Sequence, residues 1–173
     1  MPGCMRCGNC CTRFRVLITP FDIVRLSEGM RLKPAGFADL IPEDKNRTRE
    51  EPALAVGGTP MLLAIKKRAG GRCFFYSGDS CSAYAHRPLL CRAYPFVLRG
   101  GAVQDASSRA CPVKWRPSKN EAKEYQEDAA RYALEQKEFK KIAREWNSTR
   151  TGKFRELLCF LMKKAAAASS AGE

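Results

Sequence analysis

The sequence contains a single histidine, His86, and no stretch approaching the roughly 18 consecutive apolar residues that a membrane-spanning helix needs. Its N-terminus lacks the apolar core of a secretory signal peptide, and no glycine-rich nucleotide-binding loop or internal repeat is visible. These absences predict a chain without a membrane span. We expect such a protein to remain in the cytoplasm.

Cysteine, by contrast, is abundant, with nine copies in 173 residues. In a chain without an export signal, clustered cysteines more often bind metals or carry redox chemistry than form disulfides. We therefore expect no disulfide-linked partner. Hydrophobic residues make up 45% of the chain, which is enough for an ordinary packed core.

The chain is strongly basic, with 31 Lys and Arg against 18 Asp and Glu and a formal net charge of +13. This excess is suited to an acidic protein or an RNA surface as a partner. Part of it can instead offset the negative charge of a metal–thiolate site. In the C-terminal third, acidic and basic residues are interleaved, which is typical of a solvated helix surface.

Local signals place two short helices in the first quarter of the chain. Thr19-Pro20 supplies a cap and a first-turn proline, so a helix is expected to begin there and to end at Gly29. A second helix is expected from Pro34 and would bury Leu40 and Ile41.

Farther along, apolar runs predict buried strands at 61–65 and 73–76, and amphipathic periodicity predicts long helices over 118–146 and 153–168. The fold class is therefore expected to be α+β, a small irregular cysteine-rich domain followed by a helical extension. The expected divisions are 1–116 for the metal-binding domain, 117–168 for the helical extension, and 169–173 for a frayed tail.

Eight of the nine cysteines fall into two groups that predict a metal site. The first group has the spacing Cys-x2-Cys-x2-Cys-Cys, and the second is spread over the middle of the chain. Their members are Cys4, Cys7, Cys10 and Cys11, and Cys73, Cys81, Cys91 and Cys111. Eight cysteines suit two four-cysteine zinc sites or two iron–sulfur clusters, and the spacing leaves their pairing open.

The spacing favours a [4Fe–4S] cluster over zinc, in one or two centres. Cysteines at successive Cys-x2-Cys intervals wrap a cubane cluster, whose last ligand often precedes proline. Phe14 occupies the position of that ligand, but Cys111-Pro112 offers one from a distant part of the chain. Because Cys10 and Cys11 are neighbours, we expect their side chains to diverge and to serve different centres.

Two further residues are expected to stay outside the metal site. Cys159 stands alone near the C-terminus and is predicted to be a small core residue. His86 is predicted to be a loop residue, because the cysteines suffice for full ligation.

Several separated motifs then point to one family. They are the leading cysteine group, the stretch from Leu17 to Leu26, Gly71-Arg72-Cys73-Phe74, and the run from Arg87-Pro88 to Phe96. Together they resemble the YkgJ-type cysteine-cluster family, a zinc- or iron-chelating domain with a CxxCxxCC signature, over about residues 4–112. The resemblance implies that the eight grouped cysteines are the metal-binding set. The family is also similar to flagellin lysine methylases, which contain such a cysteine domain.

Arg87 and Arg92 flank Cys91 in the last motif and are candidate cofactor-binding residues. Four thiolates on zinc or on an oxidised cubane leave about two net negative charges, and guanidinium groups can donate hydrogen bonds to the sulfurs. The alternative is that both are surface or capping arginines.

Three functions stay open at this level. The first is a metal–thiolate binding protein with a structural or redox role. The second is an accessory or catalytic component of protein lysine methylation, although the chain has no separate domain long enough for a methyl-donor fold. The third is a basic zinc module that contacts RNA or the ribosome through the helices at 114–164. Whether the protein is an enzyme is left undecided.

Overall fold

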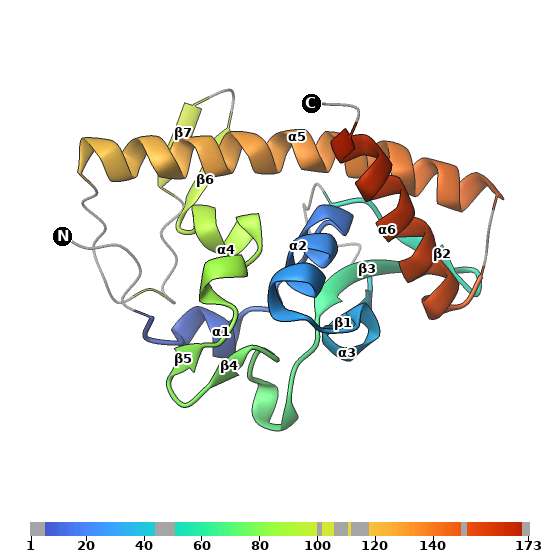
Figure 1. Ribbon diagram of the computed structural model, residues 1–173, viewed down its shortest axis with the longest axis horizontal. Coiled ribbons are helices and arrows are strands. Elements are labelled where there is room, and N and C mark those ends of the chain that lie inside the picture. Colours follow the sequence, from blue (N-terminus) through green and yellow to red (C-terminus); the bar gives the residue numbers. More distant parts are fainter. Residues whose placement is uncertain are drawn as a thin grey trace.

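The computed structural model describes residues 6–43, 51–99, 102–105, 111, 118–149 and 152–170. The architecture is α+β, as predicted, with short strands and helices followed by two long helices, α5 (Lys119–Thr149) and α6 (Phe154–Ser170). Figure 1 shows α5 running across the width of the molecule, with α6 against its C-terminal half and α4 beneath its N-terminal half. None of the helices in the described residues is long and apolar enough to span a lipid bilayer.

Helix α2 (Pro20–Met30) begins where its sequence predicts. The Thr19 hydroxyl accepts from the Asp22 amide at 3.1 Å, and the Asp22 carboxylate accepts from the Thr19 amide at 2.9 Å, which completes a capping box. The predicted end at Gly29 holds to within one residue, because the last helical residue is Met30 and the cap residue Arg31 is in the left-handed conformation (φ 52°). Gly29 lies inside the helix, where a methyl group would overlap the imidazole of His86.

An antiparallel sheet with the strand order β1–β3–β2 lies beside this helix. Its members are β1 (Ala38–Pro42), β2 (Leu54–Val56) and β3 (Thr59–Ile65), and β3 contains the strand predicted at 61–65. Helix α3 (Pro34–Phe37) is shorter than expected. Leu40 and Ile41 belong to β1 instead, where they pair with Leu63 and Leu62.

The segment after the sheet is mostly turns. After the 3₁₀ turn η1 (Ala69–Gly71), Cys73 forms an isolated bridge with Lys67, so the predicted strand at 73–76 is reduced to Tyr76 in β4. The following elements are the hairpin of β4 (Tyr76–Ser77) and β5 (Ser80–Cys81), the 3₁₀ turn η2 (Tyr84–His86), α4 (Leu89–Ala93), and the hairpin of β6 (Phe96–Arg99) and β7 (Ala102–Asp105).

Helices α5 and α6 match the two helices predicted for the C-terminal third to within about three residues. Their buried side chains share one core with those of the sheet and α2. Trp146 is fully buried, its indole nitrogen donates to the carbonyl of Ala55 at 2.8 Å, and its ring lies 5.4 Å from that of Phe160. The division of the chain at residue 116 stays a prediction, but the core contains residues from both sides of it.

Candidate metal centre

A short helix, α1 (Asn9–Arg13), carries the first cysteines of the candidate site. It begins after Gly8, whose φ of 73° is a conformation that glycine adopts without strain. The ring of Tyr76 packs directly on Gly8, so that any side chain there would overlap the phenol. Gly8 therefore serves both the helix start and the contact between α1 and the β4–β5 hairpin.

Cys10 and Cys11 lie on α1 with their sulfurs 4.0 Å apart. The expectation that these neighbouring side chains diverge is therefore wrong, because both sulfurs point to the same side of this short helix. Two thiolates on one tetrahedral zinc ion, each at about 2.3 Å, are separated by roughly 3.8 Å. The pair thus has the spacing of two ligands of a single ion.

Cys73 is attached directly to α1. Its amide donates to the carbonyl of Cys11 at 2.8 Å. The Lys67 ammonium, from the residue bridged to Cys73, donates to the carbonyls of Cys11 at 2.9 Å and Thr12 at 3.3 Å. These contacts hold two chain segments that are about sixty residues apart in the sequence, and they bring one cation next to the sulfurs.

Four of the thiols influence one another electrostatically. Every pair among Cys10, Cys11, Cys73 and Cys91 is close enough for the charges of their thiolates to interact. Cys81, on β5, interacts in the same way with Cys73 and Cys91. Segments from α1, the turn at residue 73, β5 and α4 therefore bring thiols within electrostatic reach of one another.

Burial and mutual repulsion shift the pKa values of the thiols in this group. The Cys11 thiol hydrogen-bonds to Cys10 and lowers the pKa of Cys10 to about 6, against the opposing effect of burial, with the Lys67 charge assisting. The same hydrogen bond, together with burial, raises the pKa of Cys11. Burial first, and the neighbouring thiols second, raise the pKa of Cys73 and Cys91. A dipositive ion would relieve this repulsion.

The other sulfurs are placed as follows. Cys4 lies outside the described residues, Cys7 is exposed, and Cys111 is partly buried. Cys159 is exposed on α6, so the expectation of a core residue is wrong. None of the eight cysteines within the described part of the chain forms a disulfide.

The described residues alone do not complete a metal site. No three His, Cys, Asp or Glu side chains among them stand close enough together to hold an ion. The sulfur pair of Cys10 and Cys11 has the spacing of two metal ligands. Further sulfurs must move toward this pair to complete the coordination of a metal ion.

The two arginines expected at the sulfurs have other contacts. Arg92 forms a two-pronged ion pair with Asp128 of α5, at 3.1 Å from Nε and 2.8 Å from Nη2. The guanidinium of Arg87 stacks on the ring of Tyr84, with Cζ 3.8 Å from the ring centroid. His86 lies in η2, exposed, against Gly29.

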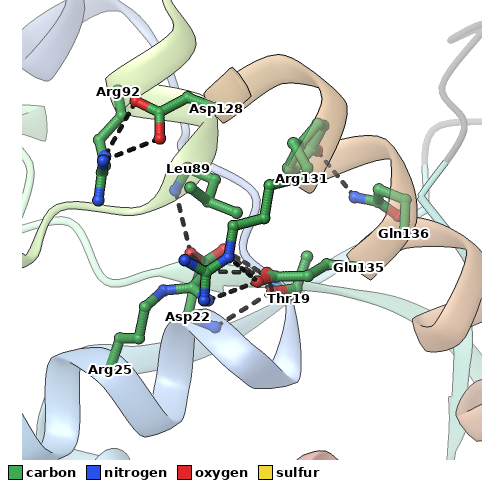
Figure 2. A network of polar contacts seen from close by, with 10 residues as sticks. Thr19, Asp22, Arg25, Leu89, Arg92, Asp128, Arg131, Glu135 and Gln136 are labelled. Atoms are coloured by element: carbon green, nitrogen blue, oxygen red, sulfur yellow. Dashed lines mark hydrogen bonds and ion pairs between the residues drawn. The ribbon is translucent and has the colours of Figure 1, made fainter. Parts of the chain in front are cut away.

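Sequence reasoning missed a buried polar network that holds α4 in place (Figure 2). The fully buried Asp22 accepts from the amide of Leu89, the first residue of α4, at 3.1 Å and from Arg25 at 2.5 Å. Arg25 also binds Glu135 of α5. Burial by itself lowers the pKa of Arg25, but the two carboxylates outweigh this effect and raise it. Since α4 carries Cys91, this network positions one of the grouped sulfurs.

Lys67 was missed as well. The only sequence signal for it is its place in the basic run Lys66-Lys67-Arg68, six residues before Cys73. Such a run is usually a solvated surface, and the contact with α1 depends on the fold.

Comparison with protein families gives one match. Residues 3–128 match the family model CxxCxxCC, described as "Putative zinc- or iron-chelating domain". The match extends beyond the cysteine groups into the first third of α5. Neither the curated proteins nor the solved structures contain a match.

Proposed function

The chain belongs to the CxxCxxCC family of zinc- or iron-chelating domains, and on this premise we propose that Cys10, Cys11, Cys73 and Cys91 together bind one tetrahedral metal ion. The observation that carries the proposal is the 4.0 Å separation of the Cys10 and Cys11 sulfurs, the spacing of two ligands on one ion. Cys73 and Cys91 are our candidates for the other two ligands, because the charges of their thiolates interact with those of the pair. Both sulfurs would have to move toward the pair when the ion binds, since no three of these sulfurs stand at ligand spacing.

The role of this ion is structural in the first place. The segments around α1, the 73–81 turns and α4 consist of helices of five residues and strands of two, which have few backbone hydrogen bonds of regular structure to stabilise them. Metal binding would add its free energy directly to the stability of such a region. Lys67 supports the proposal, because its ammonium offsets part of the roughly two net negative charges of a four-thiolate site.

A [4Fe–4S] cluster is the second candidate. The series Cys4, Cys7 and Cys10 and the Cys111-Pro112 pair favour it. A cubane with Cys4, Cys7, Cys10 and Cys111 as ligands would leave Cys11, Cys73, Cys81 and Cys91 for a second centre. A single ion on Cys10, Cys11, Cys73 and Cys91 would instead leave Cys4, Cys7, Cys81 and Cys111.

Metal analysis of single serine variants tests the proposal. The protein is purified without oxygen, its zinc and iron are counted, and its visible spectrum is recorded. Cys10→Ser, Cys11→Ser, Cys73→Ser and Cys91→Ser should each lose the same single ion, and Cys159→Ser, on exposed α6, should keep the full complement. Cobalt taken up by the wild type should show the absorption of a tetrahedral thiolate site.

Two results would contradict the proposal. If Cys11→Ser kept all of its metal while Cys10→Ser lost some, the two neighbouring cysteines would not bind the same ion. A brown protein with about four irons for each centre would establish the cluster instead. Cys7→Ser is expected to lose metal too, but from the second centre. Roles in lysine methylation or in RNA contact stay predictions, since no contact described above favours either.

A further inference from the structure

A groove of about 430 Å³ lies between α2 and the segment from η2 to α4. Its walls include Arg25, Glu28, His86, Arg87 and Arg92. A cavity of about 370 Å³ adjoins it, shares Arg87 and Arg92, and reaches α5. The groove is thus lined by three guanidinium groups and an imidazole against one carboxylate.

Two of these guanidinium groups are held by acids behind the groove. Arg25 binds Asp22 and Glu135, and Arg92 uses Nε and Nη2 on Asp128 (Figure 2). These three carboxylates fix the two arginines in position and offset their charge in full.

Arg87 differs from both. Its guanidinium has no carboxylate partner among the described residues, and its Nε is buried without a hydrogen-bond acceptor. The guanidinium of Arg87 stacks on the ring of Tyr84. Arg6 stacks on the same ring, and each Cζ lies 3.8 Å from the ring centroid. Two cations on one ring, one of them without an acid, leave a positive charge that an anion would balance.

The groove also contains a feature that local structure does not explain. Gly29 sits inside α2, where glycine is less favourable than alanine by about 1 kcal/mol. It leaves room for the imidazole of His86, which any larger residue would displace from the groove wall. The wall is therefore shaped around His86.

We propose that this groove binds a small phosphate dianion, either inorganic phosphate or the phosphoryl group of a small ester, with Arg87 as its main ligand and Arg92 and His86 beside it. The planar guanidinium matches two oxygens of a phosphate at once. Glu121, Glu124 and Asp128 line the adjoining cavity and repel an anion, so the phosphate belongs on the side of His86. This inference is independent of the metal proposal.

The single histidine makes a direct experiment feasible. The metal-loaded full chain is titrated with sodium phosphate at constant pH and ionic strength, and the imidazole proton resonance of His86 is followed by NMR. We expect a saturable shift that sulfate reverses and chloride does not. A parallel titration with glycerol phosphate distinguishes the sources, because tighter binding of the ester than of phosphate identifies an ester as the ligand.

Three variants make the test specific. Arg87→Gln should weaken phosphate binding about tenfold or more, since it loses a charged, two-pronged donor. Arg87→Lys should bind phosphate more weakly than the wild type and more tightly than Arg87→Gln, because it keeps the charge without the planar fork. Arg144→Gln removes the same charge from the exposed surface of α5 and should bind as the wild type does.

Several results would contradict the phosphate proposal. A wild-type resonance that does not move, or that drifts without saturation, overturns the proposal. If phosphate affinity fell equally in Arg87→Gln and Arg144→Gln, the binding would depend only on the net charge of the chain. Loss of metal from Arg87→Gln with unchanged phosphate binding would assign this arginine to the sulfurs. If Arg87→Gln does not fold, the sulfate competition in the wild type still shows whether the groove binds phosphate.

Discussion

Replacing Asp22 with asparagine removes one charge from the interior without changing the size of the side chain. Asp22 is fully buried, and its two oxygens accept from the Thr19 amide at 2.9 Å, the Leu89 amide at 3.1 Å and Arg25 at 2.5 Å. An asparagine has only one acceptor oxygen, so its NH₂ group must face at least one of these donors. Arg25 would keep Glu135 as a partner.

The cost follows from these contacts. Breaking a buried ion pair by removing one partner typically costs 3–5 kcal/mol, and the remaining Glu135 places this case at the lower end, at about 3 kcal/mol. For a chain of 173 residues this corresponds to a fall in Tm of roughly 6–12 °C. Asp22 also holds the first amide of α4, the helix of Cys91, so the metal content of Asp22→Asn should fall as well.

The matched control is Asp39→Asn. Asp39 is 40% exposed and pairs with Arg15 at 3.5 Å, and exposed pairs of this kind contribute at most about 1 kcal/mol. Thermal unfolding of both variants, followed by circular dichroism in the metal-loaded state, gives the comparison. Equal melting temperatures for the two variants would refute the role assigned to the buried network.

The sequence predicts those parts of the fold that depend on neighbouring residues. Thr19 and Pro20 mark the start of α2 by chemistry that acts within one turn, and the periodicity of 118–146 is long enough to define α5. The run at 61–65 forms β3 for the same reason. Each of these signals is complete within the segment that it describes.

The errors arise where a distant segment decides. Gly29 lies one residue before the end of α2, and the sequence does not show that it makes room for the imidazole of His86. Leu40 and Ile41 have a pattern compatible with a helix, yet their pairing with β3 makes them a strand. A short apolar run of this length does not separate helix from strand by periodicity.

The cysteine site shows the same division. The candidate ligands are named by their spacing in the sequence and stay a prediction, and the thiols of four of them, including Cys73 and Cys91, influence one another electrostatically in the structure. The relation of Cys10 to Cys11 depends instead on the local helix that Gly8 starts, and the place of Lys67 depends on the bridge to Cys73. The contacts that Lys67 and Cys73 make with Cys11 have no local pattern, because they join residues about sixty positions apart.

Two of these long-range contacts give further predictions. Gly8→Ala should lower metal occupancy and destabilise the protein by about 1–3 kcal/mol, because Gly8 has a φ of 73° and no space beside Tyr76; Gly36→Ala, in open space, should stay within about 1 kcal/mol of the wild type in denaturant unfolding. Lys67→Met should weaken metal binding 10–100-fold in competition with a chromophoric chelator, because the ammonium that holds the carbonyl of Cys11 and offsets the thiolate charge is lost. Lys66→Met removes the same charge from a lysine that contacts α3, so affinities that fall equally in both variants would show that only the overall charge matters.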